Sequence, residues 1–320
     1  MATEPHDTTP HDTTPGTTAS GDTAPGTTTA PVVTPTLLRT MPLPGPGGDK
    51  DGNGRVLVLG GSRRSPGAVR LAGEAVLRAG AGRVTLATIG DVVAGLSTFV
   101  PEAGMIPLRS DDDGAIALDA DDEAFDELLE EADRADVVLL GPGLVDAGHA
   151  RSLVELMLPR IGGTVVLDAV ATAYLTDRPD ALHPLADRCV VTANVKELGR
   201  MAGVEEVGSD EQLATTAEVA ARLRAVVVCG GVLKHVVDPG GEAWVIEGGG
   251  PGLGASGSGD VQAGILAGFL ARGASPAHAA VWGGYTHARA GERLAAEVGG
   301  LGYLARELPA QVPAVLNEVG

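Results

Sequence analysis

Short runs of Val, Leu and Ile alternate along the chain with longer stretches in which Ala and Leu recur at helical spacing, starting at Arg55. The apolar runs are nearly continuous, as is typical of strands that are buried on both faces of a sheet. The alternation predicts an α/β fold with a mainly parallel central sheet and helices on both of its faces. The predicted strands are residues 55–59, 83–88, 137–140, 164–167, 189–192 and 225–228.

The N-terminal segment differs from the rest of the chain. It contains the phrase His-Asp-Thr-Thr-Pro twice, at 6–10 and 11–15, and continues in Thr, Pro, Gly and Ala. It has too little apolar surface to offset the entropy cost of ordering, so we expect residues 1–35 to be disordered, while a role as a binding tail stays open. Residues 36–320 fit a single α/β domain.

Charge and cysteine content exclude several classes of protein. The formal net charge is -19, with a strongly acidic segment at 111–136. Nucleic acids and anionic membranes are bound by clustered Lys and Arg, so neither is an expected partner. Cys189 and Cys229 both lie in apolar runs, which indicates neither a disulfide framework nor a zinc site. Because the chain shows no signal-peptide pattern and no membrane-length apolar stretch, we expect a cytoplasmic protein.

Glycine and polar residues follow several of the predicted strands directly. In open α/β sheets, ligands bind at the carboxyl ends of the strands, so these residues should gather around one site. They are Gly60-Gly61-Ser62, Gly141-Pro142-Gly143, Asp168, Asn194 with Glu197, and Gly230-Gly231. Their convergence indicates a ligand site more strongly than any one motif does.

The three-residue spacing of Asn194 and Glu197 has two interpretations. It is the spacing of a capping box, in which the Asn side chain caps a helix and the Glu side chain reaches back to the cap. Alternatively, Glu197 holds Mg²⁺ through water near a phosphate, because Mg²⁺ keeps several waters and takes few direct carboxylates. Both interpretations stay open.

A glycine-rich run from Gly252 to Asp260 precedes a predicted helix. Repeated glycine lets consecutive amides point into one concavity, and the helix dipole adds roughly half a positive charge there. Gly257-Ser258-Gly259 is therefore a candidate phosphate cradle. Asp260 should lie in the first helical turn, where it could take a proton from a substrate hydroxyl or serve only as a cap.

A later Ala- and Gly-rich helical stretch contains Trp282, Tyr285 and His287, for which we expect a role in helix packing. Small residues also mark one predicted helix face, at Ala263, Gly264, Ala267 and Gly268. Such a face allows close approach of a second helix, either within the subunit or in a homo-oligomer.

The order and spacing of these motifs resemble the ADP- or ATP-dependent NAD(P)H-hydrate dehydratases, a carbohydrate-kinase-like family of the ribokinase-like superfamily. The resemblance rests on residues 54–62 with Gly67-Ala68, and on 78–82, 101–102, 141–144 and 257–264. It implies a ribokinase-like fold and a metabolite-repair activity, the dehydration of (6S)-NADHX or NADPHX to NADH or NADPH. ADP or ATP would be the phosphate donor, Mg²⁺ the cofactor and Asp260 the base.

The resemblance also implies a set of binding residues. The hydrate would contact Ala68, Gly143, Asn194 and Asp260. The nucleotide would contact Cys229, Gly230, Gly231, Val232, Leu233, Gly257, Ser258 and Gly259.

The chain departs from the family pattern at three places. Cys229-Gly230-Gly231 stands where the family shows Lys-Gly-Ala, and Lys234 is the nearest lysine that follows. Asn194 replaces a family His, and Asp168-Ala169-Val170 replaces Asp-Ala-Asp. Two other functions therefore stay open: a small-molecule kinase of the same superfamily, and a regulatory nucleotide-binding protein without activity.

Overall fold

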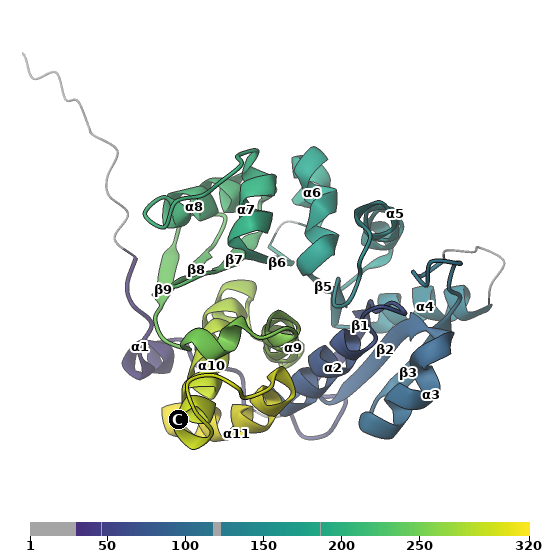
Figure 1. The fold of residues 1–320 in the computed structure, drawn as a ribbon, viewed down its shortest axis with the longest axis horizontal. Helices are drawn as coiled ribbons and strands as arrows, with labels where there is room; N and C mark the ends of the chain where they lie inside the picture. The colour runs from purple at the N-terminus through teal and green to yellow at the C-terminus, as the bar shows by residue number, and fades with distance from the viewer. Residues whose placement is uncertain (1–29, 46, 118–122, 186) are drawn as a thin grey trace, which may run out of the picture.

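The computed structural model describes residues 30–45, 47–117, 123–185 and 187–320, and residues 1–29 of the predicted tail lie outside this range. The described strands form one sheet in the order β3-β2-β1-β4-β5-β6-β7-β8-β9 (Figure 1). Neighbouring strands are parallel from β3 to β7, and the last two pairs are antiparallel. The strands are β1 Arg55–Leu59, β2 Arg83–Ile89, β3 Gly104–Leu108, β4 Val137–Leu140, β5 Thr164–Leu167, β6 Cys189–Asn194, β7 Val226–Gly230, β8 Lys234–Val237 and β9 Ala243–Ile246.

All six predicted strands are present with small changes at their ends, and the predicted mainly parallel sheet is confirmed. The prediction missed β3 and the β8–β9 hairpin. Pro107 and Gly104 interrupt the apolar pattern of β3, which is an edge strand, the place where a sheet tolerates proline. The start of β8 is polar, at Lys234-His235, although both side chains are buried.

Helices cover both faces of the sheet (Figure 1). Alternate strand residues enter two separate cores: Val56 and Val58 pack on one side of β1, while Leu57 and Leu59 pack on the other. The first core contains α2, α9, α10 and α11, and the second contains α4, α5, α7 and α8. The helices are α1 Pro35–Thr40, α2 Gly67–Arg78, α3 Gly90–Phe99, α4 Glu123–Arg134, α5 Ala147–Met157, α6 Ala173–Asp177, α7 Val195–Ala202, α8 Gln212–Leu223, α9 Ser258–Ala271, α10 Pro276–Glu297 and α11 Leu308–Val319.

The small-residue face of α9 packs inside the subunit. A Cβ atom added to Gly264 would lie 2.3 Å from the carbonyl oxygen of Ala72, and one added to Gly268 would lie 2.6 Å from that of Val76. Both carbonyls belong to α2, so these glycines let the two helices approach each other closely. This packing explains the small-residue face of α9 without a partner subunit, and a homo-oligomer stays a prediction.

The segment before α1 is part of the domain. The Val33 amide donates to the Val245 carbonyl over 2.8 Å, and the Val245 amide donates to the Pro31 carbonyl over 3.0 Å. Val33 is buried with α1 against the core that contains α11. The predicted tail boundary at residue 35 is therefore wrong, because the chain already pairs with β9 before that residue.

Candidate active site

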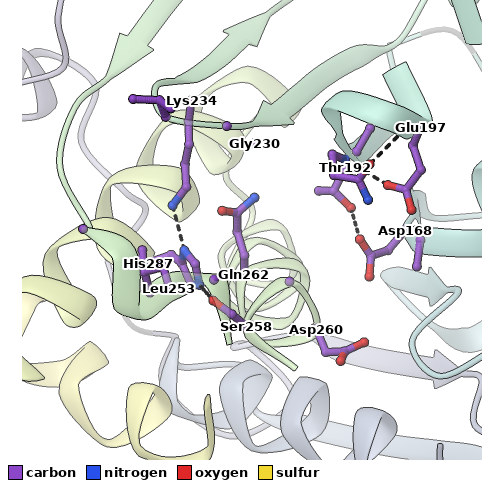
Figure 2. Close-up of a pocket in the computed structure, with 18 of the residues that line it drawn as sticks. Asp168, Thr192, Glu197, Gly230, Lys234, Leu253, Ser258, Asp260, Gln262 and His287 are labelled. Carbon is purple, nitrogen blue, oxygen red and sulfur yellow. Dashed lines mark hydrogen bonds between the residues drawn. The ribbon is translucent and has the colours of Figure 1, made fainter. Parts of the chain in front are cut away.

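A cavity of about 800 Å³ opens at the carboxyl ends of the central strands. This volume lies within the range of small-molecule sites. The lining residues come from the ends of β5, β6 and β7, the start of β8, residues 248–262 and α10 (Figure 2). The predicted site residues among them are Asn194, Glu197, Gly230, Gly231, Val232, Ser258, Gly259 and Asp260.

The glycine-rich run forms an open cradle at the start of α9. Gly257 caps the helix with a φ of 89°, a conformation that favours glycine, and an added Cβ would lie 2.5 Å from Cδ1 of Leu71. Within the described chain, the Ser258 amide donates to Ala255, while those of Gly259 and Asp260 donate no hydrogen bond. Two free amides at the positive end of a helix dipole suit a phosphate group.

Asp260 lies in the first turn of α9, as predicted. The helix has no side-chain cap, and the Asp260 carboxylate makes no hydrogen bond within the described residues. The interpretation of Asp260 as only a helix cap is therefore wrong. Burial raises the pKa of this carboxyl to about 6, which suits a general base near neutral pH.

Asp168 lies across the cavity from Asp260 (Figure 2). It is buried at the end of β5, and the Thr192 hydroxyl donates to it over 2.5 Å. Burial, followed by the negative charge of Asp260, raises the pKa of Asp168 to about 7. The sequence identified Asp168 only as a strand-end residue, and in the structure it lies close enough to Asp260 for that charge to raise its pKa.

Asn194 and Glu197 form the capping box of α7. The Asn194 side chain accepts from the amides of Lys196 and Glu197, and Oε2 of Glu197 accepts from the Asn194 amide over 2.9 Å. Both residues also line the cavity, so the capping role is compatible with water-mediated binding of Mg²⁺ by Glu197. Burial raises the pKa of Glu197.

Five predicted site residues lie outside the cavity lining: Ala68, Gly143, Cys229, Leu233 and Gly257. Ala68 and Gly143 are neighbours, since a Cβ on Gly143 would lie 2.9 Å from that of Ala68. The Cys229 thiol is buried beside Gln212, which donates to it over 3.3 Å, and burial raises its pKa to about 12. Cys229 therefore presents neither a charge nor a reactive thiolate to the cavity.

A buried polar chain that the sequence did not predict lies at one wall of the cavity. Nζ of Lys234 lies 2.7 Å from Nδ1 of His287, and Nε2 of His287 lies 2.9 Å from the Ser258 hydroxyl (Figure 2). The packing role predicted for His287 is thus incomplete, since His287 lines the cavity. Trp282 does pack in the core, where its indole donates to the Met41 carbonyl, and Tyr285 lies away from this cavity. The one sequence signal for the chain was a lysine at the start of an apolar run.

The chain has a mainly parallel sheet whose strand-end loops meet at one site. The site contains a candidate phosphate cradle, followed by an acid in the first turn of α9. These features define a nucleotide-using enzyme of the ribokinase-like class. A ribokinase-like superfamily protein from Enterococcus faecalis has the same fold, with a TM-score of 0.77 at 24% identity over 91% of this chain and 96% of that one. Within the class, the chain belongs to the NAD(P)H-hydrate dehydratase family, whose sequence model matches residues 56–314. The family resemblance is confirmed.

Three relatives are similar over most of the chain. The ADP-dependent (S)-NAD(P)H-hydrate dehydratase of Xanthomonas campestris is 42% identical over 90% of this chain and 96% of its own length. The ADP/ATP-dependent dehydratase of Bacillus subtilis, co-crystallised with ATP and Mg²⁺, is 25% identical, with a TM-score of 0.74 over 92% of this chain and its full length. The bifunctional NAD(P)H-hydrate repair enzyme of Moorella thermoacetica is 34% identical, and the chain spans about half of it (51%).

None of the helices in the described ranges combines the length and apolar character needed to cross a bilayer. The cytoplasmic location stays a prediction.

Proposed function

We propose that this protein is a nucleotide-dependent (S)-NAD(P)H-hydrate dehydratase that restores NADH and NADPH from their hydrates. The proposal rests on the N-terminal end of α9. There the Gly259 and Asp260 amides are free, and the partly buried Asp260 carboxylate lies beside them. The Xanthomonas campestris relative has this activity in its name and aligns with 90% of the chain.

In the proposed reaction, Asp260 takes the proton of the ring hydroxyl while that oxygen attacks the terminal phosphorus of ADP or ATP. The P–O bond to the remaining nucleotide breaks, and the cradle amides hold the charge on the transferring phosphoryl group. The phosphate then leaves the ring carbon, a neighbouring proton is lost, and the double bond re-forms. Water is removed as inorganic phosphate plus a proton.

We assign the predicted site residues to two ligands. Five lining residues are assigned to the nucleotide: Gly230, Gly231, Val232, Ser258 and Gly259. Cys229, Leu233 and Gly257, which lie next to them in sequence but outside the lining, keep the same assignment. Asn194, which also lines the cavity, is assigned to the hydrate together with Asp260, Ala68 and Gly143.

The site suits Mg²⁺ held mainly by the nucleotide phosphates. Asp168, Glu197 and Asp260 line one cavity, but the described residues contain no cluster of three or more His, Cys, Asp or Glu side chains close enough to bind an ion directly. Mg²⁺ commonly keeps its waters and uses one or two carboxylates besides substrate phosphates. Glu197 would bind it through water, and the ion would offset phosphate charge.

Family membership favours the dehydratase over the two alternatives. The Asn194 and Glu197 spacing forms the capping box of α7, and both residues also line the cavity, so the spacing alone does not favour a kinase. For the cation that is missing at Cys229, which suggested an inactive protein, the replacement we propose is Lys234, which lines the cavity.

The deciding experiment follows the return of reduced-nicotinamide absorbance from (6S)-NADHX with Mg²⁺ and either ADP or ATP. We expect recovery with at least one nucleotide and none without nucleotide. Asp260→Asn should lower kcat by roughly 10² to 10⁴-fold, the usual contribution of a general base, while calorimetry shows unchanged ADP binding. Failure of the wild-type protein to recover absorbance with either nucleotide would refute the proposal.

A further inference from the structure

Lys234 is a buried lysine without a carboxylate partner among the described residues. Only 8% of its surface is exposed, and it makes no ion pair with any described residue. Its Nζ atom lies 2.7 Å from Nδ1 of His287 and 3.4 Å from the Gly284 carbonyl oxygen. A buried ammonium is costly without a counter-ion, and the cavity that Lys234 lines is where the site can supply one.

The chemistry of Lys234 determines the direction of the hydrogen bonds beyond it. Burial lowers the pKa of Lys234 to about 7, and a nucleotide phosphate bound in the cavity favours its charged form. An ammonium can only donate, so with the nucleotide bound Nδ1 of His287 accepts and the ring proton is carried by Nε2. Nε2 therefore donates to the Ser258 hydroxyl over 2.9 Å. Burial and the neighbouring Lys234 hold the pKa of His287 well below its usual value, so the ring is neutral as this direction requires.

Ser258 occupies the last position of this chain and the first residue of α9. Because its oxygen already accepts from His287, its own proton is available to another acceptor. The next two amides, of Gly259 and Asp260, are the free donors of the cradle. The three donors thus belong to successive residues that all line the cavity.

We propose that Lys234 and His287 position the Ser258 hydroxyl as a third hydrogen-bond donor to the terminal phosphoryl group of the nucleotide. Ser258 touches the phosphoryl group, whereas Lys234 and His287 are positioning residues that act through it. The lysine charge polarises the whole chain, so that the serine proton is a stronger donor than an isolated hydroxyl would be. Donors fixed before the reaction stabilise the transferring charge without reorganisation. The inference rests on the proposed function only in requiring a nucleotide phosphate in the cradle.

A double-mutant cycle tests whether the three side chains act as one unit. Ser258→Ala should lower kcat by about 100-fold, as loss of one preorganised donor does, and His287→Leu and Lys234→Met should have comparable effects. The double variant Ser258→Ala/His287→Leu should be no worse than Ser258→Ala alone, because both changes remove the same hydrogen bond. Effects that multiply, or a fully active His287→Leu protein, would overturn the proposal.

Conservative replacement separates positioning from packing. His287→Gln keeps an acceptor for Lys234 and a donor for Ser258, so it should recover most of the activity that His287→Leu loses. His235→Leu is the matched control, since His235 is buried on the same strand but, with alternating side chains, faces the opposite side of the sheet. It should leave kcat unchanged, and equal losses in His287→Gln and His287→Leu would contradict the inference.

Calorimetry with ADP and AMP distinguishes failure of this inference from failure of the proposed function. Ser258→Ala and His287→Leu should each weaken ADP binding about tenfold, the size of one hydrogen bond to a charged group, and leave AMP binding unchanged. This comparison stays decisive if the wild-type protein binds ADP but dehydrates nothing. If the wild type is active and the variants weaken ADP and AMP equally, the polar chain does not reach the terminal phosphoryl group.

Discussion

Asp168 makes the stability of the unliganded protein depend on pH. Its pKa is about 7 in the folded protein against an ordinary value of 3.8. Since the folded state holds the proton more tightly, the contribution of this group to stability is complete below about pH 4 and is lost as pH rises to about 7. Near neutral pH, ionisation of the buried Asp168 carboxyl beside Asp260 lowers the free energy of unfolding.

We therefore expect Asp168→Asn to remove most of this pH dependence. The amide can still accept from Thr192, so the fall in unfolding free energy between about pH 4 and pH 7 should shrink by up to about 4 kcal/mol. Urea unfolding at the two pH values measures the difference. Asp126→Asn, an exposed carboxylate on α4, should leave the wild-type dependence in place. An equally steep fall in the Asp168→Asn protein would show that Asp168 is already ionised.

The same substitution tests which carboxyl group controls the pH profile of catalysis. Asp260 must be deprotonated to act as a base, so kcat/KM of the wild type should rise with pH through about 6 and then level off. Asp168, Glu197 and Lys234 are the other charged groups that line the cavity. Asp168 has the higher pKa, about 7, so it is still neutral when Asp260 loses its proton, and Asp168→Asn should leave the acid limb near pH 6. A limb that moves to lower pH in Asp168→Asn would mean that Asp168 is already ionised when Asp260 titrates.

At the scale of elements, the contact between α2 and α9 fixes the cradle relative to the sheet. Gly264→Ala would place a Cβ atom 2.3 Å from a backbone oxygen of α2, a contact that no rotamer change can relieve. We expect a loss of about 1 to 3 kcal/mol in unfolding free energy from this overpacking, read from urea unfolding. Gly95→Ala, at an exposed position in α3 with open space around it, should instead be neutral or stabilising by up to about 1 kcal/mol. Equal effects of the two substitutions would rule out a steric cause.

The elements also show which signals a sequence carries. The apolar runs of β1, β4 and β5 predicted parallel strands because strands buried on both faces need no polar alternation. The cradle was predictable because its glycines and Asp260 are consecutive. The polar chain was not, because it joins residues 29 and 53 positions apart, and only the folded sheet brings β8, α9 and α10 together. Lys234 and His287 each look, in sequence, like ordinary residues of their own elements.

At the scale of the whole molecule, the first described residues pair with the edge of the sheet that carries Lys234. Residues 31–33 pair with Val245 of β9, β9 pairs with β8, and β8 begins with Lys234. Leu38 of α1 is fully buried, and the Trp282 indole donates to the Met41 carbonyl. This segment therefore contacts both β9 and α10, the helix that carries His287.

Truncation separates this segment from the residues before it. Removing residues 1–29 should leave the melting temperature and the Km for ADP unchanged, because the contacts described above begin at Pro31. Removing residues 1–41 exposes the partners of Val33, Leu38 and Met41, and burying each such side chain contributes roughly 1.5 to 3 kcal/mol. The longer truncation should therefore melt at a clearly lower temperature and lose ADP affinity as β8 and β9 loosen. A longer truncation that melts like the full chain would show that the sheet edge, and with it Lys234, is held without the N-terminal segment.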